Sequence, residues 1–234
     1  MKNKRVLPAL KAAFPHTLPI LAGFIALGMG YGIYHRSAGL PIWFAPLTSI
    51  LVFGGSLEFL LVSMLLAPFQ PLIVFFLSLL VQARHLFYGL SMLDKYRGKG
   101  IIGAYLIYSM CDETFSVNCS AEPPEGVDET LFMFFVSFLD QSYWIISVTL
   151  GSLLGGTLSN YSRGVEFVMT AMFTVIFLKE MDKKSSRIPG LIGILATALS
   201  LVIFGKSVFL IPSMVLFLIF LFVFRASIER REDL

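Results

Sequence analysis

Charged residues are scarce in this sequence. Only 14% of its 234 residues are Asp, Glu, Lys or Arg, whereas 56% are hydrophobic and the mean hydropathy is +0.81. An ordinary soluble domain carries about 25% charged residues, so this composition excludes that class and favours a lipid environment. The net charge of +3 comes from basic residues in short loops and at both ends of the chain, so we expect no nucleic-acid partner.

Cysteine is also scarce, because Cys111 and Cys119 are the only two. This count offers no disulfide framework and no cysteine metal site, and we expect neither a metal nor a cofactor. The basic start, MKNKRVLPALKAAF, precedes an apolar run without a small-residue cleavage site, which predicts an uncleaved membrane anchor.

Long apolar runs are abundant instead. Many approach the roughly 20 residues with which a helix crosses a bilayer core of about 30 Å. The runs lie at about 17–34, 40–67, 72–93, 101–118, 131–156, 165–178, 188–204 and 207–224. We therefore predict an all-α polytopic membrane protein with six to eight hydrophobic helical segments, embedded in the lipid bilayer.

The placement of Lys and Arg predicts how these segments are oriented. If the second and sixth segments enter and leave on one side, Lys95, Arg97, Lys99 and Arg163 join the basic residues of the termini on the cytoplasmic side. The acidic 119–129 loop is then external. This arrangement obeys the positive-inside rule better than eight full crossings, although 40–67 is long enough to cross with tilt.

The same two segments share a short pattern, GSLEFLLVSM at 55–64 and GVEFVMTAM at 164–172. Inverted repeats with broken helices near the membrane midplane are a recurring plan of secondary transporters. We predict one transmembrane domain over 1–234, built from inverted repeats 1–118 and 131–234 that each contain a broken or re-entrant segment.

Ionisable side chains at membrane depth are costly and usually mark a pathway. Those within the apolar runs are Glu58, Arg84, His85, Asp112, Glu113, Asp140 and Glu166. Seven are more than a bundle needs for packing alone, so this set supplies the candidate sites.

The stretch Gly54-Gly55-Ser56 weakens a helix just before Glu58. A break here exposes backbone N–H groups at the start of a half-helix, where a substrate carboxylate binds well. The alternative is a contact of small residues between helices. We assign Gly28 and Gly32, spaced as GxxxG, to helix packing.

In SLLVQARHLFYG, helical spacing places Ser78, Gln82 and His85 on one face and turns Arg84 toward Tyr88. Arg84 keeps its charge when buried, so it needs a carboxylate. That partner is either Glu58, Asp112 or Glu113 or the substrate itself. His85 is either a proton carrier or a hydrogen-bonded bundle residue.

A further polar group lies in AYLIYSMCDETFS at 104–116. On one continuous helix its members share a face: Tyr105, Tyr108, Ser109, Asp112 and Ser116. Asp112 and Glu113 are adjacent carboxylates, so one of them holds a proton at membrane depth unless Glu113 reaches the external surface. Asp140 and Gln141 in the fifth segment are placed to hydrogen-bond across helices.

Three motifs in this order, GGSLEF at 54–59, QARHLFYGLSM at 82–92 and CDETFS at 111–116, resemble those of the AzlC family of branched-chain amino acid exporters. The usual forms there are close to AGSAQF, NARHLLYG and TDETFA. The later GVEFVMTAMF is similar to that family's D-F-x-x-x-A-x-F segment. The chain departs from the pattern at Glu58, where glutamine is usual, at Gln82, where asparagine is usual, and at Glu166, where aspartate is usual.

The resemblance implies export of small neutral amino acids through a prokaryotic cytoplasmic (inner) membrane, together with a small AzlD-type membrane subunit and without catalysis. With it, we expect a proton-coupled exporter whose termini are cytoplasmic. The expected substrate-binding residues are Gly54, Gly55, Ser56, Glu58, Gln82, Arg84 and His85. The candidates for proton coupling are Glu58, Asp112, Glu113, Asp140 and Glu166.

Two other functional classes remain open. Ser56 within Gly-Gly-Ser-Leu, followed by His85, has a superficial likeness to the intramembrane serine proteases, although Leu57 replaces their usual glycine. A structural membrane subunit that does not transport by itself is the other alternative. Glu58 either pairs with Arg84, binds the substrate ammonium or carries a proton.

Overall fold

The computed structural model describes most of the chain and shows only helices there. It covers residues 3–68, 70–158 and 184–205, with short pieces at 170–171, 174–175, 177–178, 181–182, 209, 212–213, 215–217 and 219–223. The helices are α1 Asn3–Ser37, α2 Phe44–Leu51, α3 Gly55–Leu66, α4 Pro71–Val81, α5 Ala83–Ser91, α6 Leu93–Tyr96, α7 Gly100–Tyr108, α8 Asp112–Ser120, α9 Glu129–Leu158 and α11 Lys184–Phe204. No strand occurs in these residues, so the predicted all-α class is confirmed.

The chain divides into two compact units, Met1–Met169 and Thr170–Leu234. Among the described helices of the first, α1 and α9 are long and apolar enough to cross a membrane, and α11 is so in the second. The pair α4 and α5 qualifies as one span with a 46° bend, and α3 is a shorter apolar helix. The polytopic membrane character read from the sequence is therefore confirmed.

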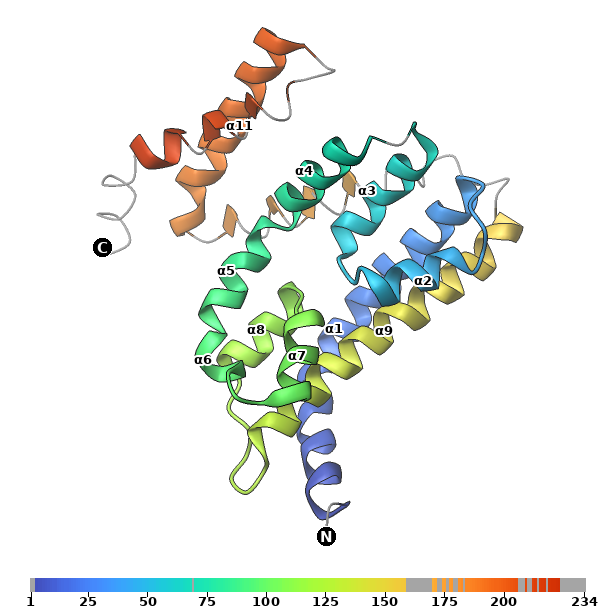
Figure 1. The fold of residues 1–234 in the computed structure, drawn as a ribbon, viewed down its shortest axis with the longest axis vertical. Coiled ribbons are helices and arrows are strands. Elements are labelled where there is room, and N and C mark those ends of the chain that lie inside the picture. The colour runs from blue at the N-terminus through green and yellow to red at the C-terminus, as the bar shows by residue number, and fades with distance from the viewer. Residues whose placement is uncertain are drawn as a thin grey trace. The chain divides into compact units, whose positions relative to one another are not determined.

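The longest helices of the first unit, α1 and α9, pack side by side (Figure 1). Glycines make this close approach possible: a Cβ at Gly28 would lie 2.8 Å from the Cβ of Ser147, and one at Gly32 would collide with the backbone of Val148. Gly151 faces the backbone of Met29 in the same way. The assignment of Gly28 and Gly32 to helix packing is confirmed.

A buried cluster fixes the shorter helices to this pair. It joins α1, α6, α7 and α9, with Met110 in the link that follows α7, and its members are Ala13, Met92, Tyr96, Leu106, Met110, Phe132, Met133 and Val136. Because this cluster lies at the start of α9, it holds the ends of α7 and α6 against a regular helix. The irregular backbone described next is therefore supported by a packed core.

Candidate substrate pocket and buried carboxylates

The first helix interruption separates α2 from α3. Helix α2 ends at Leu51, α3 begins at Gly55, and Phe53 between them has φ 41°, in the left-handed region that a bulky residue rarely adopts. Gly54 lies directly against the side-chain amide of Gln82, so a Cβ at this position would displace that amide. The break predicted around Gly54 is confirmed, and α3 starts without a side-chain cap.

A second interruption lies at Gln82, between α4 and α5, where the helix axis bends by 46°. The helix predicted to carry Ser78, Gln82 and His85 is therefore not continuous, although Gln82 and His85 line the same pocket. No glycine or proline lies between residues 72 and 88, so the sequence contains no helix-breaking residue that would predict the bend.

The third interruption runs from Ser109 to Cys111, between α7 and α8. It divides the polar stripe predicted along one helix, which is a second correction to the sequence reading. The hydroxyl of Thr114 accepts a hydrogen bond from the Cys111 backbone N–H at 2.7 Å, so the new helix start is capped within its own first turn. Asp112 and Glu113 thus lie at a helix N-terminus.

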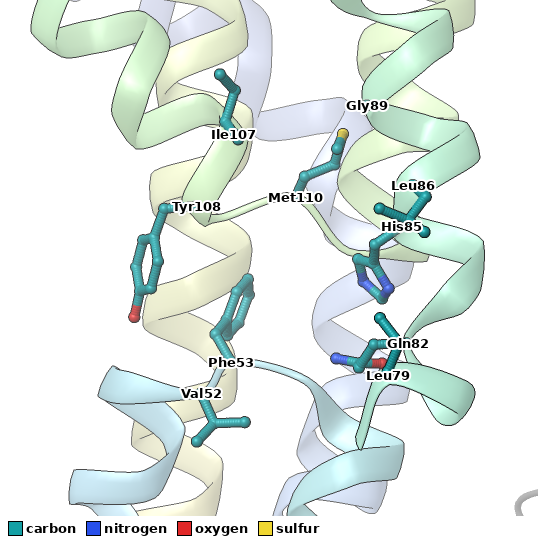
Figure 2. Close-up of a pocket in the computed structure, with 10 residues that line it drawn as sticks. All are labelled: Val52, Phe53, Leu79, Gln82, His85, Leu86, Gly89, Ile107, Tyr108 and Met110. Atoms are coloured by element: carbon teal, nitrogen blue, oxygen red, sulfur yellow. The ribbon is translucent and has the colours of Figure 1, made fainter. Parts of the chain in front are cut away.

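The three interruptions converge on one pocket of about 460 Å³ (Figure 2). Its lining residues are Val52, Phe53, Leu79, Gln82, His85, Leu86, Gly89, Ile107, Tyr108 and Met110. The volume falls within the roughly 300–1,000 Å³ usual for small-molecule sites. Most of the lining is aliphatic or aromatic, and Gln82, His85 and Tyr108 are the polar side chains among these ten.

Two polar atoms of this lining have no hydrogen-bond partner among the described residues: Oε1 of Gln82 and Nδ1 of His85, both buried. Figure 2 shows the two side chains extending from the same helix pair toward the space beside Phe53 and Met110. Buried polar atoms normally find a partner, so these two atoms can form hydrogen bonds with a molecule in the pocket.

Arg84 lies beside the pocket lining and holds three helices together. Its guanidinium forms an ion pair with Asp112 at 2.9 Å and donates a hydrogen bond to Ser56 Oγ at 3.2 Å. The hydroxyl of Tyr88 donates to the same Asp112 carboxylate at 3.0 Å. Of the partners left open by the sequence, Asp112 is the one that contacts Arg84, and α5 is thereby linked to the starts of α3 and α8.

The contacts of Ser56 bear on the protease alternative. Its hydroxyl accepts the hydrogen bond from Arg84, and no hydrogen bond joins it to His85 in the described part of the chain. A serine nucleophile needs its base within hydrogen-bond reach. The geometry therefore gives Ser56 a role in helix linkage and provides no catalytic dyad.

Glu58 is completely buried, and its side-chain hydrogen bonds go to residues other than Arg84. Its carboxylate accepts hydrogen bonds from Ser49 Oγ at 2.6 Å and from the indole N–H of Trp144 at 2.9 Å. These donors come from α2 and α9, so Glu58 joins the start of α3 to the packed helices. Sequence reasoning missed Ser49 and Trp144, although an indole N–H in an apolar span always requires an acceptor.

Asp140 and Gln141 are adjacent in the sequence but differ in their hydrogen bonding. Gln141 accepts a hydrogen bond from the hydroxyl of Tyr105 on α7 at 2.7 Å, which confirms the predicted bond across helices. Asp140 is fully buried, and neither carboxylate oxygen has a hydrogen-bond partner within the described residues. Glu113 lies close enough to Asp140 for their charges to interact.

Glu166 and the second broken segment predicted near 164–166 lie outside the described residues. Within the described part, no group of three or more His, Cys, Asp or Glu side chains is arranged to hold a metal ion.

These features define a polytopic α-helical membrane protein with a small-molecule pocket where helices are interrupted. The sequence profile of the family described as AzlC protein matches residues 19–158. The chain is 43% identical over 231 residues to the branched-chain amino acid transport protein AzlC of Bacillus subtilis, an alignment covering 99% of this chain and 91% of that protein. The chain belongs to the AzlC family.

Two further relatives are named only as uncharacterized membrane proteins. One, from Haemophilus influenzae, is 42% identical over 211 residues, covering 88% of this chain and 85% of the relative. The other, from Helicobacter pylori strain J99, is 36% identical over 223 residues, covering 95% and 98%. No solved structure gives a significant match to the chain.

Proposed function

We propose that this protein is a secondary transporter that exports small neutral amino acids, chiefly branched-chain ones, and is not an enzyme. Family membership and the name of the Bacillus relative support the substrate class. The observation that carries the proposal is the pocket at the three helix interruptions, which combines an aliphatic lining with two unpaired polar atoms.

The pocket chemistry suits an amino acid. Side chains such as Leu79, Leu86 and Met110 offer contact to an aliphatic tail, because burying apolar surface stabilises by about 25 cal/mol per Å². The unpaired Gln82 Oε1 is an acceptor for the substrate ammonium. His85 Nδ1 accepts from the ammonium or donates to the carboxylate, depending on its tautomer.

The start of α3 supplies the remaining binding groups. Gly54, Gly55 and Ser56 place backbone N–H groups at an uncapped helix N-terminus next to Phe53, where the positive end of the helix dipole favours a carboxylate. Arg84 reaches the same place through Ser56, with a guanidinium that the substrate carboxylate would share with Asp112. Glu58 serves this site by holding the start of α3 in position.

The wider context follows from the resemblance and the charge pattern. The protein acts in the cytoplasmic membrane of a prokaryote with both termini inside, pairs with a small AzlD-type membrane subunit and couples export to protons. It forms one transmembrane domain with inverted repeats at 1–118 and 131–234. Coupling requires a carboxylate that gains and loses a proton, and the candidates are Glu58, Asp112, Glu113, Asp140 and Glu166.

Filling the pocket at Gly89 tests this function. A Cβ there meets nothing nearer than Met110 Cε at 3.8 Å, so a larger side chain is accommodated at the expense of pocket volume. In proteoliposomes that contain the protein and its small subunit, we expect Gly89→Leu to abolish leucine flux and to retain part of the flux of alanine. Gly23→Leu is the matched control, because a Cβ at Gly23 has no heavy atom within 4 Å.

Equal leucine flux in wild type and Gly89→Leu would contradict the assignment of this pocket. An absence of amino acid flux in folded wild type with its subunit would contradict transport itself and favour the structural-subunit alternative.

A further inference from the structure

Asp140 is the least satisfied carboxylate of the described protein. Its side chain is 0% exposed and lies near the middle of α9, and neither of its oxygens has a hydrogen-bond donor among the residues that the structure describes. Glu58 is equally buried but accepts two hydrogen bonds from neutral donors. An ionised carboxylate without donors or a cation is costly at membrane depth, so Asp140 must hold either a proton or another cation.

Among the described residues, Glu113 is the charged group that acts on Asp140. Glu113 approaches from the N-terminus of α8, with the thiol of Cys111 beside it, and the phenol of Tyr105 approaches from α7. Helix α2 has no ionisable side chain, and α1 has none between His16 and Tyr31. Two carboxyls whose charges interact in a low dielectric carry one proton and one charge more readily than two charges.

The position of Glu113 connects this pair to the pocket. Glu113 follows Asp112 in the sequence, and the Asp112 carboxylate binds Arg84 and Tyr88 on α5. The charge of Glu113 interacts with Asp112, Arg84 and Tyr88. Arg84 in turn binds Ser56 at the start of α3. A charge that appears near Glu113 therefore acts on the contacts that hold two of the helix interruptions around the pocket.

We propose that Asp140 and Glu113 together form the binding site of the coupling proton, and that Glu58 does not carry it. This inference rests on the proposed transport function for its physiological meaning. The proton resides on a carboxyl oxygen of the pair and leaves to water without any covalent change elsewhere. A buried carboxyl without a hydrogen-bond donor among the described residues suits a proton, and a sodium gradient is the alternative that the transport experiment tests.

The first experiment separates coupling from substrate binding. In proteoliposomes with the small subunit, leucine/leucine exchange without a gradient is compared with net leucine movement driven by a pH gradient. We expect Asp140→Asn and Glu113→Gln to lower gradient-driven movement by at least about tenfold, equivalent to 1.4 kcal/mol, while exchange persists. The exposed-loop control Glu125→Gln keeps both activities.

Asp140→Glu keeps a titratable carboxyl and should retain gradient-driven movement with an altered pH profile. A merely structural role for Asp140 predicts the opposite order, with the isosteric Asn tolerated and the longer Glu harmful. Gradient-driven movement that survives in Asp140→Asn, or movement driven by a sodium gradient instead of a pH gradient, would overturn the proposal.

A second experiment detects the proton without transport. Infrared difference spectra of the purified complex, recorded during a pH titration, report the C=O stretch of a buried protonated carboxyl. We expect a titrating band in wild type and in Glu58→Gln that is missing in Asp140→Asn. A band that persists in Asp140→Asn would overturn the site even if the protein transports leucine. A band that disappears as expected from a protein without leucine exchange would support the site and reject the proposed function.

Discussion

Two regions of the first unit differ in their helices: one has long unbroken helices, and the other has short helices separated by interruptions. Helices α1 and α9 run unbroken for 35 and 30 residues and meet through glycines. The shorter helices are interrupted at Phe53, Gln82 and Met110, and those interruptions line the pocket. Unbroken helices satisfy their own backbone groups and give a rigid support, whereas broken ones expose backbone and are tolerated at membrane depth only beside protein or a cavity.

Buried polar side chains occur in both regions. On the packed side, Glu58 and Tyr31 are fully buried and hydrogen-bonded, Tyr31 to Thr48 at 2.9 Å. Around the interruptions, Gln82 and His85 keep unpaired polar atoms, and Arg84 and Asp112 remain about one third exposed. Unpaired polar atoms also occur in the unbroken helices, at His35 of α1 and Asp140 of α9. The interrupted region differs because its unpaired atoms, on Gln82 and His85, line the pocket.

The largest effect should follow from widening the contact between α1 and α9. In Gly32→Leu the side chain would collide with the backbone of α9 at Val148, which cannot move aside as a flexible side chain does. We expect loss of at least about 1–3 kcal/mol of stability, the range for overpacking, and a large fall in the yield of folded protein. Thermal unfolding followed by size-exclusion chromatography measures this.

Gly23→Leu provides the control for that substitution on the same helix, because its Cβ would meet open space. An unchanged melting temperature in Gly32→Leu would show that α1 and α9 do not pack as tightly as described.

The second largest effect should follow from breaking the ion pair between Arg84 on α5 and Asp112 on α8. We expect Arg84→Ala and Asp112→Ala each to lower leucine flux strongly, and the double variant to be no worse than either single one, because both remove one ion pair. The cost in stability should be only about 1 kcal/mol, since the pair is partly exposed and therefore screened. A double-mutant cycle of flux and of melting temperature gives the coupling energy.

Additive losses in that cycle would show that the two residues act separately. A strong loss of flux in Arg84→Ala together with normal flux in Asp112→Ala would assign Arg84 to the substrate carboxylate rather than to helix linkage.

The smallest effect should come from Glu58→Gln. The amide oxygen accepts the bond from the Trp144 indole and the amide nitrogen donates to Ser49, so both contacts survive the change. We expect stability and flux close to wild type. In contrast, Glu58→Leu leaves the indole N–H unpaired and should cost about 1–3 kcal/mol, measured by thermal unfolding.

Loss of pH-driven flux in Glu58→Gln with a normal melting temperature would move the proton site from Asp140 and Glu113 to Glu58.

Several features of this protein follow from its sequence alone. Scarce charge and long apolar runs determine a helical membrane protein, because backbone groups in lipid must be satisfied within the helix. The spacing of Gly28 and Gly32 predicts a close helix contact, because glycine has no side chain to hold the helices apart. The consecutive Gly54 and Gly55 predict a helix interruption, because glycine is a poor helix former.

Tertiary structure decided the remaining features. No glycine or proline lies at the interruptions at Gln82 and at Ser109–Cys111. The spacing of apolar residues therefore predicted helices that continue through both positions. Three acidic residues were equivalent partners for Arg84 by sequence, and only the meeting of α5 with α8 selects Asp112. The isolation of Asp140 likewise depends on what packs around α9, because hydrogen bonds between distant segments are set by three-dimensional proximity and not by local pattern.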